Sequence, residues 1–142
     1  MKKEKIVLGM SGGVDSSVAA LLLKEKGYDV HAIFMKNWDD KHAICNSEDD
    51  FADASSVCKA LDIKLKKINY TKEYKNRVFN KFIQDHVEGF TPNPDVLCNR
   101  EIKFDVFRNY AKEIGADKIA SGHYARVVKQ NNSYFIKKAK DK

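Results

Sequence analysis

The fold is decided by the stretch Lys5-Ile6-Val7-Leu8-Gly9-Met10-Ser11-Gly12-Gly13-Val14-Asp15-Ser16. Its first part, residues 6–10, is apolar or small throughout, which is typical of a strand buried on both faces. A polar turn with two adjacent glycines follows, and residues 16–26 then show the apolar spacing of an amphipathic helix that ends at Gly27. The stretch therefore predicts a buried strand that turns directly into a helix.

The same alternation continues along the chain and predicts an α/β fold. Further strands are expected over residues 28–35, 63–68 and 118–121, helices over 51–61, 74–89 and 102–114, and a hairpin over 125–128 and 134–136. A strand, helix and second strand in succession imply a parallel pair with a right-handed connection. We therefore expect an open, Rossmann-like parallel sheet with helices on both faces.

Composition excludes several classes of protein. With 43% hydrophobic and 32% charged residues, the chain resembles an ordinary globular domain and not a disordered one. No apolar run approaches the ~20 residues that cross a bilayer, and no secretory signal is present, so we expect a cytoplasmic protein without membrane contact. The three cysteines, Cys45, Cys58 and Cys98, include no close C-x-x-C pair, which argues against a disulfide framework or a zinc site.

The net charge of +6 is concentrated at one end, because residues 126–142 contain six basic side chains and one acidic one. We expect residues 1–128 to form the nucleotide-binding domain and residues 129–142 to form a basic hairpin edge. A basic edge on a nearly neutral domain favours a phosphate-rich partner, although a solvated tail would account for the charge equally well.

The turn after the first strand has the features of a phosphate-binding loop. Free backbone N–H groups and the helix dipole attract anions at a helix N-terminus. Gly12 and Gly13 let the backbone approach phosphate oxygens closely, whereas the carboxylate of Asp15 points to a bridging Mg²⁺. Ser16 is a candidate helix cap. The alternative is that the glycines only make a tight turn and that Asp15 or Ser16 caps the helix.

A second chemical motif is Thr91-Pro92-Asn93-Pro94-Asp95-Val96-Leu97-Cys98-Asn99-Arg100-Glu101-Ile102-Lys103-Phe104. We interpret residues 91–95 as a proline-stiffened loop that places Cys98 before a helix. The helix N-terminus, Arg100 and Lys103 are expected to lower the pKa of the thiol, and Asp95 could act as a base or orient a substrate. The alternative is a buried structural cysteine.

Both motifs carry a family resemblance. The string S-G-G-x-D-S after a first strand resembles the signature of the ATP-pyrophosphatase or PP-loop superfamily, of adenine-nucleotide alpha-hydrolase type. It lacks the lysine of the P-loop and the spacing of the dinucleotide motif. The cysteine motif, together with Gly9-Met10, Phe34-Met35-Lys36-Asn37-Trp38 and Ala120-Ser121-Gly122-His123-Tyr124-Ala125-Arg126, resembles the tRNA-specific 2-thiouridylases over nearly the whole chain.

The resemblance implies a reaction and a set of site residues. ATP, held with Mg²⁺, would adenylate the C2 oxygen of the wobble uridine in tRNA, and a persulfide from a sulfur-donor protein would then supply sulfur. Cys98 would be the nucleophilic cysteine, with Asp95 beside it, and Asn93, Pro94 and Asp95 would contact the target base. The implied ATP-binding residues are Gly9, Met10, Ser11, Gly12, Gly13, Val14, Asp15, Ser16, Met35 and Gly122, with Asp15 as the candidate Mg²⁺ ligand.

The family places its persulfide-bearing cysteine and most of its tRNA surface beyond residue 142. We therefore expect this chain to bind ATP but not to complete sulfur transfer alone. Two other functions are considered: a PP-loop ligase that adenylates a small-molecule oxygen, in which Cys98 is incidental, and an ATP-binding module without complete activity. Cys45 and Cys58 are interpreted as structural, and His123 either binds phosphate or packs beside the loop.

Overall fold

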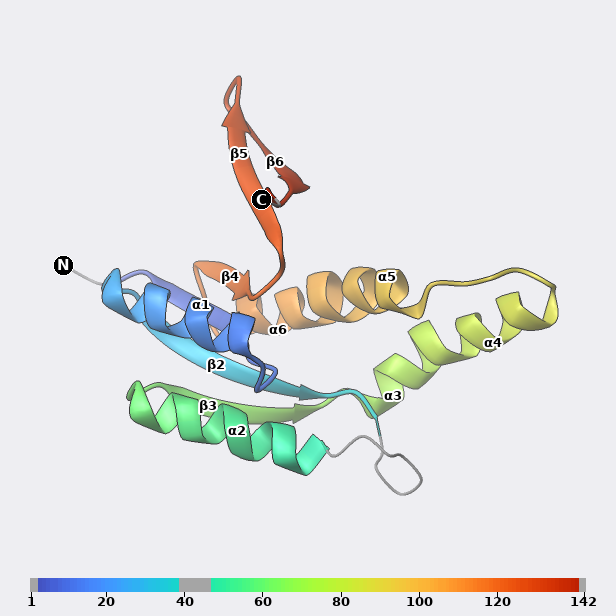
Figure 1. Cartoon of the computed structure of the whole chain (residues 1–142), viewed down its shortest axis with the longest axis horizontal. Helices are drawn as coiled ribbons and strands as arrows, with labels where there is room; N and C mark the ends of the chain where they lie inside the picture. Colours follow the sequence, from blue (N-terminus) through green and yellow to red (C-terminus); the bar gives the residue numbers. More distant parts are fainter. Residues whose placement is uncertain (1–2, 39–46, 141–142) are drawn as a thin grey trace.

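The structure is a computed structural model that describes residues 3–38 and 47–140. Its main sheet has the strand order β3-β2-β1-β4 (Figure 1). The strands are β1 (Lys5–Gly9), β2 (Asp29–Lys36), β3 (Lys64–Asn69) and β4 (Lys118–Ser121). All three pairings are parallel, which confirms the predicted sheet.

Helices cover both faces of this sheet, as Figure 1 shows. Helices α1 (Val14–Glu25) and α2 (Ser47–Ala60) pack on one face, and α6 (Phe107–Glu113) packs on the other. Adjacent residues of a strand point to opposite faces, so Leu8 belongs to the core under α1 and α2, whereas Val7 contacts the Phe107 side. The predicted fold class is confirmed.

The predicted helix over residues 74–89 is one helical run with a π-helical middle. It consists of α3 (Thr71–Tyr74), the π-helix η2 (Lys75–Phe79) and α4 (Asn80–Val87). The end of this run projects beyond the sheet (Figure 1). Its type was predicted correctly, but its start lies three residues earlier than expected.

The second long run corrects part of the predicted loop over residues 91–95, since residues 91–93 are loop but residues 94 and 95 are helical. Helix α5 (Pro94–Cys98) continues into the π-helix η3 (Asn99–Val106) and then α6. Asn93 is the N-cap, and its Oδ1 accepts hydrogen bonds from the backbone N–H groups of Asp95 (3.0 Å) and Val96 (3.2 Å). Proline suits the first helical position, where its missing N–H would have no partner, so Pro94 starts the helix that it was expected to prevent.

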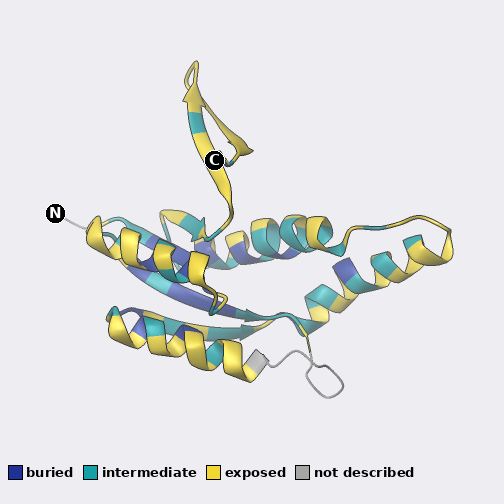
Figure 2. Cartoon of the chain, viewed as in Figure 1, coloured by how far each residue is buried: buried dark blue, intermediate teal, exposed yellow. Residues whose placement is uncertain are grey.

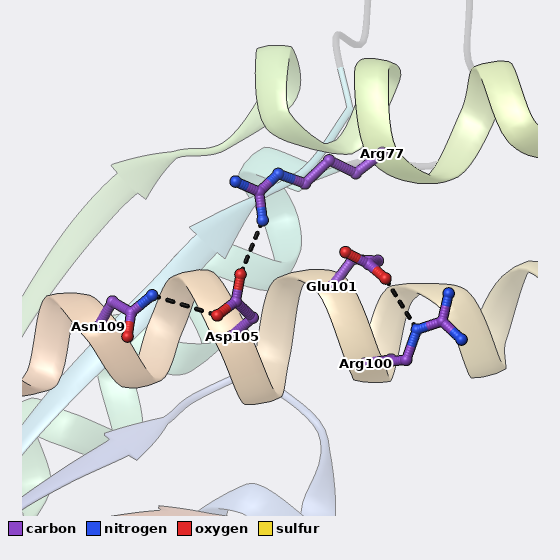
Figure 3. Close-up of polar contacts among 5 residues, drawn as sticks. All are labelled: Arg77, Arg100, Glu101, Asp105 and Asn109. Carbon is purple, nitrogen blue, oxygen red and sulfur yellow. Dashed lines mark hydrogen bonds and ion pairs between the residues drawn. The ribbon is translucent and has the colours of Figure 1, made fainter.

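The two helical runs pack against each other at their π-helical segments. Val78 of η2 and Ile102 of η3 are fully buried and share a cluster with Tyr70. Across the same contact, Arg77 Nη1 donates to Asp105 Oδ2 at 2.7 Å (Figure 3). The segment with Cys98 is thus fixed to the run that starts at Thr71.

A separate antiparallel hairpin is formed by β5 (Ala125–Gln130) and β6 (Ser133–Lys138), as predicted. It projects from the sheet and is exposed along almost its whole length (Figures 1 and 2). Because β5 crosses residue 128, the expected boundary there would divide a strand, and the division into 1–128 and 129–142 stays a prediction. Among the described residues, no helix is long and apolar enough to span a membrane.

The substitution Ile102→Ala tests the contact between the π-helical segments. We expect it to lower the free energy of unfolding by about 2–5 kcal/mol, because it leaves a cavity in a fully buried cluster. Chemical denaturation followed by circular dichroism measures the change. Ile136→Ala on the exposed strand β6 is the matched control and should change stability by less than about 0.5 kcal/mol. Equal losses for the two variants would contradict the proposed packing.

Candidate active site

A cavity of about 1020 Å³ lies at the carboxyl ends of β1, β2 and β4. This is where open parallel sheets bind their ligands. Nine of the ten predicted ATP-binding residues line it: Gly9, Met10, Ser11, Gly13, Val14, Asp15, Ser16, Met35 and Gly122. The structure therefore brings the phosphate loop together with Met35 and Gly122, which lie far away in the sequence.

The phosphate loop is held by its own serine hydroxyls. Gly13 is the N-cap of α1 and makes no side-chain cap, so the expectation that Ser16 caps the helix is wrong. The Ser16 hydroxyl instead donates to the Gly13 carbonyl (3.0 Å) and accepts from the Ser11 backbone N–H (3.2 Å). Ser17 Oγ also donates to the Gly13 carbonyl, at 2.8 Å. Ser16 lies inside the first turn because the helix begins two residues earlier.

Two close backbone contacts clamp the loop from outside. A Cβ on Gly122 would lie 2.5 Å from Ser16 N and 2.6 Å from the Asp15 carbonyl carbon. A Cβ on Gly12, whose φ is +87°, would lie 2.4 Å from the Asp50 carbonyl oxygen. Only glycine fits at either position, so the loop after β4 and the start of α2 both fix the shape of the loop.

Carboxylates at the cavity suit a metal ion that is shared with a ligand. Asp15 and Asp50 both line the cavity. Within residues 3–38 and 47–140, no cluster of three or more His, Cys, Asp or Glu side chains could hold a metal by itself. Mg²⁺ is commonly bound by one or two carboxylates, with water and substrate phosphates as its other ligands. The donor set therefore fits a nucleotide-bound Mg²⁺.

Cys98 lies outside the cavity wall, at the end of α5, and is half-buried. Burial raises the pKa of the Cys98 thiol, Lys103 opposes this change and Asp95 adds to it. The expected lowering of the pKa is therefore wrong. Cys98 is the fifth helical residue, beyond the free N–H groups of the first turn, and Arg100 is already paired with Glu101 at 2.8 Å (Figure 3).

Asn93, Pro94 and Asp95 of the cysteine motif do not line the cavity, whereas Lys103 and Phe104 of the same motif do. Asn93 caps α5, Pro94 starts it, and Asp95 lies exposed in its first turn. Burial raises the pKa of Tyr74, and the negative charges of Cys98 and Asp95 raise it further. Tyr74 therefore lies close to both of these groups, which the sequence did not indicate.

His123 connects the cavity to the helix that carries the thiol. Its Nδ1 lies 2.7 Å from Ser121 Oγ and its Nε2 lies 3.2 Å from Asn99 Oδ1. Burial, and then the charge of Lys103, lower the pKa of His123, which favours the neutral imidazole. In this form Nε2–H donates to Asn99 and Nδ1 accepts from Ser121. The ring thus packs beside the loop and joins the end of β4 to the residue after Cys98.

The sequence analysis gave no functional role to several residues that line the cavity, among them Asn37, Trp38, Asp50 and Phe104. Their positions were the available signal for three of them, since Asn37 and Trp38 follow a strand that ends at the cavity and Phe104 follows the cysteine. The arrangement is thus a cavity at the carboxyl ends of the strands, bordered by the glycine- and serine-rich loop, with a thiol outside one wall.

Comparison with known proteins shows the family of the chain. A family model described as tRNA methyl transferase HUP domain matches residues 4–142. Proteins named tRNA-specific 2-thiouridylase MnmA are similar over 99% of this chain: one from Buchnera aphidicola at 52% identity and one from Nitrosomonas europaea at 54%. The chain spans 39% and 40% of the length of these two relatives.

Solved structures agree with the observed fold. The U34-tRNA thiolase NcsA from Methanococcus maripaludis, with its 4Fe-4S cluster, has a TM-score of 0.60 and 26% identity over 84% of this chain and 38% of its own. An NMN synthetase from Francisella tularensis, at TM-score 0.53 and 22% identity, covers 83% of this chain and 44% of its own and shows the fold alone. The resemblance in the motifs is confirmed, and the chain belongs to the tRNA methyl transferase HUP domain family.

Proposed function

We propose that this chain binds ATP and takes part in the ATP-dependent 2-thiolation of the wobble uridine of tRNA. The observation that carries the proposal is the cavity in which the clamped phosphate loop lies next to the helix of Cys98. Relatives above 50% identity that are named 2-thiouridylases support the choice of substrate. The three cysteines of the chain and the proposed tRNA substrate suit the reducing cytoplasm.

ATP would occupy the cavity with its phosphates at the loop. Backbone N–H groups at the start of α1 and the helix dipole attract the phosphate oxygens. Asp15 would hold Mg²⁺ together with those oxygens, and Met35 and Gly122 would border the adenosine. The chain thus supplies a rigid backbone cradle and one carboxylate, which position the α-phosphate for attack.

The chemistry would proceed in three displacements. The uridine C2 oxygen attacks the α-phosphorus, a new O–P bond forms, and pyrophosphate leaves. The terminal sulfur of a persulfide then bonds to C2, and AMP leaves with the former C2 oxygen. Attack by a second thiolate on the remaining S–S bond releases the thiolated uridine and leaves a disulfide, which a thiol reductant must later open.

Cys98 would take part in this exchange as the nucleophilic thiol, while Asn93, Pro94 and Asp95 meet the target base. Cys58 is only 1% exposed and is unsuited to sulfur transfer, and Cys45 lies outside the described residues. A sulfur-donor protein that carries a persulfide is therefore part of the proposal. The basic side chains of the hairpin would contact tRNA phosphates.

One observation favours an alternative. Cys98 does not line the cavity, and its raised pKa keeps the thiol protonated near neutral pH. A PP-loop ligase that adenylates a small-molecule oxygen would need no thiol at all. Both functions need ATP and Mg²⁺, so the identity of the molecule that is adenylated distinguishes them.

Pyrophosphate release separates the two functions. We expect unmodified tRNA to stimulate release of pyrophosphate from ATP by this chain, and Cys98→Ser to leave this release intact, because adenylation precedes sulfur chemistry. Sulfur incorporation is not expected from this chain alone, even when a persulfide donor is supplied, so the corresponding cysteine-to-serine substitution is tested in a full-length relative, where it should abolish incorporation. Release that ignores tRNA but responds to small carboxylates or amides would favour the ligase instead.

Gly122→Ala tests the clamp on the phosphate loop. The added Cβ would overlap backbone atoms of Asp15 and Ser16, so the loop must shift, and we expect ATP affinity to fall by about tenfold or more. Isothermal titration with a non-hydrolysable ATP analogue measures the loss. Gly115→Ala is the control, since its Cβ meets no atom within 4 Å and the backbone strain at its φ of +70° lies away from the loop. Equal ATP affinities in both variants would refute the clamp.

The raised pKa of Cys98 predicts its alkylation rate. Below the pKa the thiolate fraction, and with it the rate, should rise about tenfold for each pH unit, and the rise should continue above pH 9.0, the ordinary value. Asp95→Asn removes a nearby negative charge and should speed the reaction, whereas Lys103→Gln should slow it. Iodoacetamide labelling read by peptide mass spectrometry distinguishes Cys98 from Cys45 and Cys58. A rate that levels off near neutral pH would contradict this environment.

A further inference from the structure

The proposed function leaves Trp38 without a role. It is the only tryptophan of the chain, it lies two residues beyond the end of β2, and it lines the cavity. Its side chain is nevertheless 42% exposed. A large aromatic ring that remains exposed at a cavity is typical of a binding surface, because the fold would be more stable if the ring were buried.

Two aromatic neighbours fix the orientation of this ring. The Trp38 ring meets Tyr74 at a centroid distance of 5.7 Å and an interplanar angle of 86°. It meets Phe79 at 5.0 Å and 67°. Both partners come from the helical run that starts at Thr71, which lies beside the end of β2 (Figure 1). Edge-to-face contacts of this kind hold the indole in place before any ligand arrives.

The same contacts place the ring between the two halves of the site. Tyr74 packs in the cluster that includes Cys98, so one side chain separates the indole from the neighbourhood of the thiol. The indole also lines the cavity of the phosphate loop. A group stacked on Trp38 would therefore be within reach of both the activated phosphate and the cysteine helix.

The neighbouring residue adds hydrogen-bonding chemistry. Asn37 lines the same cavity, and its buried Oδ1 accepts no hydrogen bond from any described residue. A buried acceptor without a donor is costly, and a bound ligand with an N–H group would remove the cost. A planar ring with an N–H edge, such as a nucleobase, offers both the face for Trp38 and the donor for Asn37.

We propose that Trp38 is the platform on which the target base of the RNA stacks once it has left its own stack. This proposal rests on the proposed function and names the subsite for its substrate. Enzymes that modify a base hold it between aromatic or apolar side chains after extrusion. The adenine of ATP is the other planar group available. Its proposed neighbour Met35 lies close to the sheet, since the Met35 methyl carbon would lie 3.3 Å from a Cβ on Gly9.

The single tryptophan makes the test direct, because indole fluorescence of the chain reports only Trp38. We expect a short anticodon stem-loop RNA with unmodified uridine at the wobble position to quench this fluorescence. The same RNA with an abasic wobble position should bind without quenching. Quenching by a non-hydrolysable ATP analogue alone, and none by RNA, would overturn the proposal and assign the ring to adenine.

Substitutions supply the second arm. Trp38→Leu should weaken binding of the stem-loop by about fivefold to a hundredfold, and Trp38→Phe should largely restore it, because any aromatic face can stack. Binding of the ATP analogue should not change in either variant. Phe90→Leu, which removes a ring that is 64% exposed and lies outside both the cavity and the hairpin, is the matched control.

The outcomes distinguish this proposal from the proposed function. If tRNA stimulates pyrophosphate release but Trp38→Leu binds the stem-loop as tightly as the wild type, the platform is refuted and the thiolation function stands. If the RNA neither binds nor stimulates release, the proposed function fails, and the platform fails with it.

Discussion

The approach of the Gly122 backbone to Asp15 and Ser16 is the contact on which the site depends. Strands β1 and β4 are parallel neighbours, with Gly9 opposite Ser121, so both strands end at the same edge of the sheet. The chain leaving β4 must therefore cross the start of α1 at a distance that allows no side chain. Because this crossing is fixed, the next residue, His123, is fixed as well, and its ring reaches Asn99 beside the cysteine. One steric constraint thus couples the phosphate loop to the helix of the thiol.

The site then divides into two centres of different character. At the loop the cavity is built from small residues such as Ser11, Gly13 and Ser16, which suits a polyanion that is held by N–H groups. Cys98 lies instead among apolar neighbours, where burial disfavours the thiolate. Lys103 lines the cavity and also acts on both Cys98 and His123, so its charge is shared between the centres. A cation in this position opposes the desolvation of the thiol and keeps the imidazole neutral.

Local pattern was enough for the fold, because buried strands and amphipathic helices leave their period in the sequence. The turn between β1 and α1 was located for the same reason, since its glycines lie between a strand and a helix, and its binding of phosphate stays a prediction. The cysteine motif shows where such inference ends. Two prolines argued against a helix, yet Asn93 supplies a cap that makes Pro94 a favourable first residue. The pKa of Cys98 depends on burial among residues such as Tyr70 and Val78, more than 15 positions away along the sequence. The role of Trp38 was not predicted for a similar reason, because its aromatic partners come from a helical run that is distant in the sequence.

The π-helical segments explain how those distant residues come together. Tyr74 is the last residue before η2, and Cys98 is the last residue before η3. The thiol and the phenol beside it therefore both lie where an α-helix changes to a π-helix. π-Helical turns are rare and occur frequently at functional sites. The exposed Arg77–Asp105 pair across these segments contributes little, about 0–1 kcal/mol, since both side chains are more than 40% exposed. The fully buried Val78 and Ile102 must therefore hold the two segments in register. The wide turns are stabilised by apolar packing beneath them, which leaves the polar groups at their ends available for chemistry.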